Sequence, residues 1–187
     1  MRFRPLLLVI LAGALAGCGD RRLLLGVDAL SFTSPQDRVD PFGPVPALVV
    51  PVQTGEVPVL DDLHVNLFGG ADQIVNVDQA TLTLSANLAD STGSGLDTLR
   101  VYMSDVSTDP RTTAPVVIAP VVLTPGQSTS IHAVVGGDPR VTSLFTNSQM
   151  RVTVTTSLQG PAVGQPLNGV ITLTTLRADV VASRRNM

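Results

Sequence analysis

From Val57 onward, apolar and polar side chains alternate with the two-residue period of β-strands that bury one face. The alternation is clearest over residues 75–88, where a one-residue slip at Asp78-Gln79 indicates a β-bulge. The side chains expected to face a core are Val75, Val77, Ala80, Leu82, Leu84, Ala86 and Leu88, and those expected on the opposite face are Thr81, Thr83, Ser85 and Asn87. The segment predicts a half-buried antiparallel strand.

Turn residues separate this strand from further alternating runs. Residues 90–95 (Asp-Ser-Thr-Gly-Ser-Gly) precede a run in which Leu99, Val101 and Met103 alternate with polar neighbours, so we expect the two runs to form a hairpin. The Pro125-Gly126 turn separates the apolar run 116–123 from the alternating run 128–135. These two runs predict a second hairpin.

One short helix and two late strands complete this half of the chain. Asp138-Pro139 combines an N-cap carboxylate with proline at the first helical position, which predicts a helix near 138–146. Its core-facing side chains are expected to be Val141, Leu144 and Phe145. The last strands are expected at 151–158, with Val152 and Val154 inward and Arg151, Thr153 and Thr155 outward, and at 170–181.

Prolines dominate residues 35–58, and each one fixes φ and removes a backbone donor. This spacing favours extended, polyproline-like segments and edge pairing over helices or central strands. Leu48–Val50 is expected to be a short edge strand between prolines. Before this region, partial alternation over Leu23–Phe32 predicts the first strand of the fold.

These elements predict an all-β fold, an antiparallel β-sandwich with one short helix, with a small barrel as the alternative. Residues 23–182 are expected to form a single domain, followed by a C-terminal tail at 183–187. The Pro-Gly turn and the short helix between late strands make the pattern similar to immunoglobulin-like domains of envelope lipoproteins. The Cys-Trp-Cys pattern of true immunoglobulin domains is absent, so the resemblance implies architecture alone.

The N-terminus has the pattern of a secretory signal. Arg2 and Arg4 precede an apolar run over residues 6–16, which is too short for a transmembrane helix of about 20 residues. The run ends in Leu15-Ala16-Gly17-Cys18, which contains the only cysteine of the chain. We therefore expect residues 1–17 to be cleaved.

At Leu15-Ala16-Gly17-Cys18 the chain resembles bacterial lipoproteins, whose lipobox has this pattern. The resemblance implies that Cys18 becomes the mature N-terminus and carries acyl chains such as palmitate, with residues 18–22 as a lipidated tether. It also implies outer-membrane delivery, facing the periplasm or the surface, because Gly19 rather than Asp follows the cysteine. Arg21 and Arg22 would then either touch anionic lipid head groups or be simply solvated. The alternative is a buried free cysteine after an ordinary secretory signal.

Composition narrows the function classes. After cleavage, 10 basic residues, all arginine, remain against 15 acidic residues, which argues against nucleic acid as a partner. Aromatic residues make up 3% and tryptophan is absent, which argues against stacking platforms for sugars. With Cys18 acylated, no thiol remains for a disulfide or a thiolate metal site.

Candidate catalytic and metal-binding residues are few. Asp61, Asp62 and His64 could gather at a strand end, whereas His132 is expected to be solvated on an outward strand face. Ser94 lies in a Gly-Ser-Gly turn that lacks the features of a nucleophile elbow. The carboxylates expected in turns, which do not form a calcium loop of the Asp-x-Asp-x-Asp-Gly type, are Asp37, Asp40, Asp90, Asp97, Asp105, Asp109 and Asp138.

The sequence thus predicts a non-enzymatic binding or structural module, held on the membrane by its lipid anchor at Cys18. The expected partner is another envelope protein, with no catalytic residue, no cofactor and no metal ion. The alternative is an envelope hydrolase or a small-ligand carrier with a pocket at one end of the sandwich.

Overall fold

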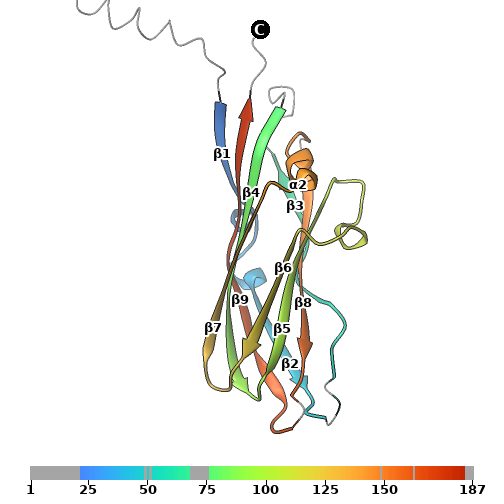
Figure 1. The fold of residues 1–187 in the computed structure, drawn as a ribbon, viewed down its shortest axis with the longest axis vertical. Coiled ribbons are helices and arrows are strands. Elements are labelled where there is room, and N and C mark those ends of the chain that lie inside the picture. The colour runs from blue at the N-terminus through green and yellow to red at the C-terminus, as the bar shows by residue number, and fades with distance from the viewer. Residues whose placement is uncertain are drawn as a thin grey trace, which may run out of the picture.

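The computed structural model describes residues 22–48, 50, 52–67, 76–147, 149–161 and 163–183, which form two antiparallel β-sheets packed face to face (Figure 1). In the first sheet the strand order is β1-β9-β4-β7, and β2 also pairs with β9. In the second sheet the order is β3-β8-β5-β6. The strands are β1 (Arg22–Asp28), β2 (Val39–Val45), β3 (Val57–Asn66), β4 (Asn76–Thr92), β5 (Gly95–Ser104), β6 (Val117–Leu123), β7 (Ser128–Gly136), β8 (Gln149–Gln159) and β9 (Leu167–Ser183).

The predicted antiparallel sandwich is confirmed, and its connectivity is that of a jelly roll. From β3 to β9 each strand crosses to the other sheet except at β5 and β6, which are paired neighbours in the second sheet, and this pattern of two interlocked Greek keys gives the orders 1-9-4-7 and 3-8-5-6. The structure therefore shares its two-layer architecture with immunoglobulin-like domains but has the strand order of a jelly roll.

The two predicted hairpins are wrong, although their turns exist. β4 pairs with β7 and β9, whereas β5 pairs with β6 and β8, so the Gly93-Ser94 turn carries the chain from one sheet to the other. The Pro125-Gly126 turn likewise joins β6 in the second sheet to β7 in the first. A turn signal shows where the chain reverses, but packing decides whether the reversed strand pairs with its neighbour or lies over it.

β4 carries the alternation that the sequence predicts. Val77, Ala80, Leu82, Leu84, Ala86 and Leu88 are all buried. The pairing of β4 with β9 shifts between Val77 and Gln79, which confirms the predicted bulge. Val75 lies outside the described residues.

At the start of the domain, the strand predicted over Leu23–Phe32 is shorter than expected, and two 3₁₀ helices and an edge strand follow it. The first strand ends at Asp28, whose side chain accepts a hydrogen bond from Leu30 N and caps the 3₁₀ helix η1 (Ala29–Phe32). A second 3₁₀ helix, η2 (Gln36–Arg38), leads into β2, which pairs along β9 despite its two prolines. Leu48 and Val50 lie outside the strands and Val49 lies outside the described residues, so the edge strand expected at Leu48–Val50 is not found, and the edge strand of this region is β2.

The predicted helix is confirmed as α2 (Pro139–Leu144). Asp138 accepts a hydrogen bond from Arg140 N and Pro139 occupies the first turn. Val141 and Phe145 are buried, and Leu144 packs against the core. The fold also has a 3₁₀ helix, η4 (Pro110–Thr112), before β6. In the described part of the chain, no helix is long and apolar enough to cross a membrane.

Candidate functional site

Of the predicted cluster of Asp61, Asp62 and His64, only Asp62 and His64 approach each other, at an irregular point within β3, whereas Asp61 forms an ion pair of 3.8 Å with Arg111. The pairing of β3 with β8 slips there, and Asp62 has a positive φ of 47°. His64 Nε2 lies 3.6 Å from Asp62 Oδ2, and Arg151 Nε donates a hydrogen bond to Asp62 Oδ1 at 2.5 Å. This hydrogen bond lowers the pKa of Asp62. Asp62 is therefore an ionised partner of Arg151.

This cluster lines a hollow of about 470 Å³ between β3 and the segment that carries η1 and η2, which we call the acidic groove. Its carboxylates are those of Asp37, Asp40, Asp61 and Asp62, and the exposed ring of Phe32 lies beside them. Burial raises the pKa of Asp40. Among the described residues, no three His, Cys, Asp or Glu side chains are placed to hold one metal ion. The groove can attract cations by charge without forming a cage for a metal.

Three of the carboxylates expected in turns do act as local caps. The backbone N–H groups of Ser107, Arg111 and Arg140 donate to Asp105, Asp109 and Asp138, respectively, at 2.8 to 3.0 Å. The hydrogen bond from the Arg140 side chain lowers the pKa of Asp138, and the one from the Ser107 side chain does so for Asp105. Asp40 and Asp90 lie in strands β2 and β4 instead.

Asp97, also expected in a turn, is buried in the core. It lies in β5 on the same face as Leu99 and Val101, and it is 0% exposed. Thr156 Oγ1 donates to Asp97 Oδ1 at 2.5 Å, while Oδ2 has no hydrogen-bond partner among the described residues. Burial raises the pKa of Asp97 to about 6. The sequence signal was the spacing, because Asp97 precedes Leu99 by two residues and so shares its face.

A polar network covers part of the outer face of the second sheet. Glu56 accepts hydrogen bonds from Tyr102 Oη at 2.7 Å and from Thr155 Oγ1 at 3.0 Å. Arg100 Nε lies 3.5 Å from Glu56 Oε1, and Arg100 also donates to Ser157 Oγ at 2.8 Å. Burial, and next the hydrogen bond to Glu56, raise the pKa of Tyr102. These groups hold the segment before β3 against the sheet.

This network explains a difference from the sequence prediction. Thr153 and Thr155 were expected to face solvent, yet both are buried. Thr155 is covered by Glu56, and Thr153 accepts a hydrogen bond from Asp62 N at 3.1 Å. Thr153 and Thr155 do point away from the core, but the irregular stretch of β3 at Asp62 and Glu56 in the preceding segment bond to them and bury them.

On the outer face of the first sheet, Ser85 Oγ and His132 Nδ1 form a hydrogen bond of 2.9 Å. The two residues are directly opposite each other in β4 and β7, and His132 is exposed as predicted. The imidazole forms no hydrogen bond or ion pair with a carboxylate in the described part of the chain. Ser94 is exposed beside Gly93, which has a φ of 79°. Only the register of β4 and β7 brings Ser85 and His132 together, so the sequence alone could not show this pair.

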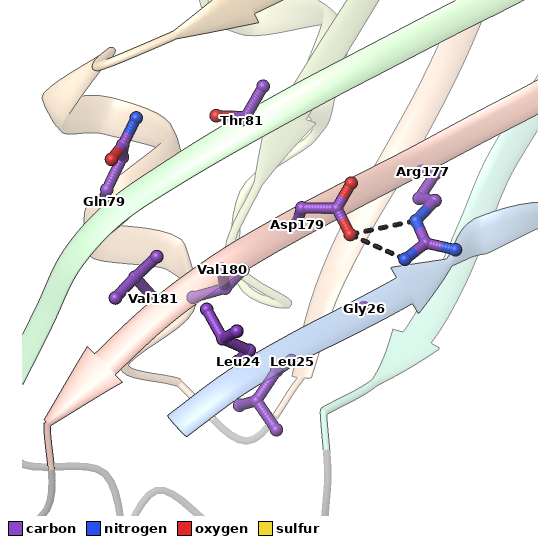
Figure 2. Close-up of a pocket in the computed structure, with 9 residues that line it drawn as sticks. All are labelled: Leu24, Leu25, Gly26, Gln79, Thr81, Arg177, Asp179, Val180 and Val181. Carbon is purple, nitrogen blue, oxygen red and sulfur yellow. Dashed lines mark hydrogen bonds and ion pairs between the residues drawn. The ribbon is translucent and has the colours of Figure 1, made fainter. Parts of the chain in front are cut away.

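A second hollow, of about 410 Å³, crosses the outer side of β1, β9 and β4 (Figure 2). Arg177 and Asp179, two residues apart in β9, form an ion pair of 2.7 Å beside Gly26. A Cβ atom at Gly26 would lie 2.7 Å from Arg177 Nη2, so the glycine makes room for the guanidinium. The charges of this hollow therefore neutralise each other.

The outer edge of β6 carries exposed apolar side chains. Ile118 and Val122 point outward with 59% and 68% exposure, and Pro120 between them is also exposed. β6 is the last strand of its sheet, so its outer backbone edge has no strand paired with it in the described structure. We call this surface the β6 edge.

No protein-family model and no curated protein matches the chain. Solved structures with a similar arrangement include the Gx strain of infectious bursal disease virus, at 11% identity and a TM-score of 0.40, and the VP2 subviral particle of that virus, at 14% and 0.34. Both matches cover 89% of this chain and 38% of the other, so the chain spans well under half the length of those proteins. The likeness concerns the arrangement of strands and says nothing about function.

Proposed function

We propose that this protein is a lipid-anchored, non-enzymatic binding module of the bacterial cell envelope, attached at Cys18 and binding another envelope protein through the β6 edge. The lipobox supports the anchor and, with Gly19 after the cysteine, an outer-membrane location. These N-terminal residues lie outside the described residues.

The observation that carries the binding role is the β6 edge itself. An unpaired strand edge offers backbone N–H and C=O groups to an added strand, and alternate side chains supply specificity. Ile118 and Val122 would face matching apolar residues of the partner, while Pro120 removes one donor and so limits indiscriminate pairing. An extended segment of another envelope protein fits this surface.

Binding rather than catalysis is also supported by the residues that could act as acids or bases, because most of them form hydrogen bonds or ion pairs that stabilise the fold. Asp62 is engaged by Arg151, and Glu56 is engaged by Tyr102 and Thr155. The Ser85–His132 pair lies on the outer face of the first sheet, where no carboxylate bonds to the imidazole in the described structure.

The anchor is tested by metabolic labelling with a fatty acid in cells that express the full chain. Wild type and Ser94→Ala, which alters an exposed hydroxyl far along the chain, are expected to be labelled equally. Cys18→Ser is expected to lose the label and to accumulate as precursor, because the thiol is the acceptor. Equal labelling of Cys18→Ser would refute the lipoprotein assignment.

The binding surface is tested by placing a photo-crosslinking residue at Ile118 in living cells. A discrete adduct is expected, and Val122→Asp on the same edge should abolish it. The same crosslinker at Val134, which is 54% exposed on β7 in the other sheet, is the matched control. An adduct of the same size and yield from both positions would contradict binding at the β6 edge.

A second candidate function, the carriage of a small cationic ligand, is favoured by the four carboxylates of the acidic groove. A ligand that binds only the folded state raises the melting temperature. A polyamine should then stabilise the wild type, and the gain should disappear in Asp40→Asn but persist in Asp78→Asn, which lies outside the groove. The same shift in both variants would exclude the groove as the binding site.

A further inference from the structure

The strands at the edges of the two sheets differ in charge. On one side of the sandwich, the edge strands β1, β2 and β3 each contain charged side chains, among them Asp28, Asp40 and Asp61, respectively. On the other side, the edge strands β6 and β7 contact each other, and the whole stretch 112–137 that contains them has no Asp, Glu, Lys or Arg. Charged residues on an edge strand normally prevent pairing with other chains. The side formed by β6 and β7 lacks this protection.

The β6 edge combines the lack of charge with exposed apolar side chains. Ile118 and Val122 point outward there. The residue opposite Ile118 in β5 is Arg100, and its guanidinium is engaged by Glu56 and Ser157. A charged group of a partner placed on this surface would lose water without gaining an opposite charge. The surface therefore favours an uncharged partner segment.

Pro120, midway between these side chains, determines which backbone groups the β6 edge offers. In an antiparallel ladder, residues alternate between those that bond to one neighbouring strand and those that bond to the other. Proline has no N–H, so the ladder with β5 keeps all its hydrogen bonds only if the backbone of Pro120 faces the free edge where it pairs with Thr98. Ile118 and Val122 then face the same way. The free edge presents N–H donors at two of these three positions and carbonyl oxygens at all three.

A second copy of this chain matches this edge poorly. Antiparallel pairing of two β6 strands, centred on Pro120, places Ile118 opposite Val122 and the two prolines opposite each other. Both Pro120 carbonyl groups then lack a donor. A register in which each proline faces another residue of β6 also leaves two carbonyl groups without donors, one for each missing N–H. A strand of a different protein that contains no proline leaves only one.

We infer that the β6 edge accepts an uncharged, proline-free strand of a different protein, and that Pro120 is the residue that excludes a second copy of this chain. This inference rests on the proposed binding role of the β6 edge and adds the chemistry of the partner. Apolar side chains of the partner lie against Ile118 and Val122, and its N–H opposite Pro120 donates to the Pro120 carbonyl oxygen. Specificity comes from the hydrogen bonds that the wrong partner loses as well as from the contacts of the right one.

Pro120→Val should make the edge self-associating. The valine restores an N–H donor in each copy, so two hydrogen bonds form that the wild type cannot make. Each is worth about a fivefold change in the association constant, so self-association should strengthen about 25-fold.

The test uses the full chain in living cells, with a photo-crosslinking residue at Ile118 and two co-expressed copies that carry different epitope tags. An adduct that contains both tags reports self-pairing, whereas an adduct with one tag reports another protein. Wild type should give single-tag adducts. Pro120→Val should raise the yield of the two-tag adduct about 25-fold and retain the single-tag adduct, which shows that the variant is folded.

Two controls place the effect at the β6 edge. Val122→Asp added to Pro120→Val should remove the two-tag adduct, because it puts a charge on the paired edge. Pro41→Val removes a proline from the edge strand β2, beside Asp40. With the crosslinker at Val39, which is 45% exposed in β2, this variant should give no two-tag adduct.

Three results would overturn the inference. They are a wild type that forms mainly two-tag adducts, a Pro120→Val variant with no more two-tag adduct than wild type, and a crosslinked partner segment, mapped by mass spectrometry, with a charged residue or proline beside the crosslink. Failure of the proposed function is distinguishable from these. If wild type forms no adduct while Pro120→Val forms the two-tag adduct, binding of another protein is refuted and the exclusion of a second copy by Pro120 stands.

Discussion

Asp97 is a carboxyl group that is buried without an ion-pair partner among the described residues, and its replacement tests the energetic cost of that burial. It is 0% exposed, its Oδ1 accepts a hydrogen bond from Thr156, and its Oδ2 has no partner among the described residues. Burial raises its pKa from the ordinary 3.8 to about 6. This difference corresponds to about 3 kcal/mol, because each tenfold change in proton affinity is worth about 1.4 kcal/mol.

The sign follows from proton linkage. The folded state holds the Asp97 proton more tightly than the unfolded state, so below pH 3.8 both states are protonated and there is no penalty. As the pH rises from 3.8 to about 6, the unfolded chain loses the proton first and stability falls. Above about pH 6 the full destabilisation of about 3 kcal/mol is present.

Asp97→Asn should remove this pH dependence. The amide oxygen still accepts the hydrogen bond from Thr156, but the new buried N–H₂ without a partner costs about 1–2 kcal/mol. We therefore expect the variant to be about 1–2 kcal/mol more stable than wild type at pH 8. Its advantage should disappear at pH 4, where the wild-type carboxyl is largely neutral in the folded state.

The assay is urea denaturation of residues 19–187 between pH 4 and pH 8. The difference in unfolding free energy between Asp97→Asn and wild type should change by about 2–3 kcal/mol over this range. Asn87→Ala, which changes no ionisable group, should give a difference that is flat in pH. A flat difference for Asp97→Asn as well would refute the argument.

Three further predictions concern the core, a close backbone contact and metal independence. Leu84→Asp should unfold the domain while Thr83→Asp is tolerated, because only the first buries an unpaired charge. The unfolding free energies of the two variants should differ by several kcal/mol, and a greater loss for Thr83→Asp would mean that the faces of β4 are assigned backwards. Gly169→Ala should cost about 1–3 kcal/mol in urea because its Cβ would collide with the Phe42 ring, whereas Gly55→Ala meets no neighbour, and equal effects would contradict the packing. Residues 19–187 should remain a soluble monomer with an unchanged β-type circular dichroism spectrum in chelator and reductant, and a large loss of signal on chelation would reveal a structural metal.

The sequence by itself determined most strands from β3 onward and the buried face of β4. Burial with a period of two residues is a local property, so the inward face of β4, including its bulge at Asp78, could be read directly. The cap at Asp138 and the proline after it likewise specified α2, because both act within one helical turn. The approach of His64 to Asp62 was also predictable, since the two are near neighbours in the chain, whereas the ion pair of Asp61 with Arg111 was not.

Only the tertiary structure decided how the strands pair and which side chains meet across them. A chain reversal like the one at Gly93 is needed both in a hairpin and in a crossing from one sheet to the other. Contacts between residues far apart in sequence decide which of the two forms. The same long-range pairing places Asp97 against Thr156, Glu56 against Tyr102, and Ser183 opposite Arg22. The alternation within a strand is set by neighbouring residues, whereas the register of the strands and their sheet are set by the whole core. This is why the polar network and the Ser85–His132 pair could not be found before the fold was known.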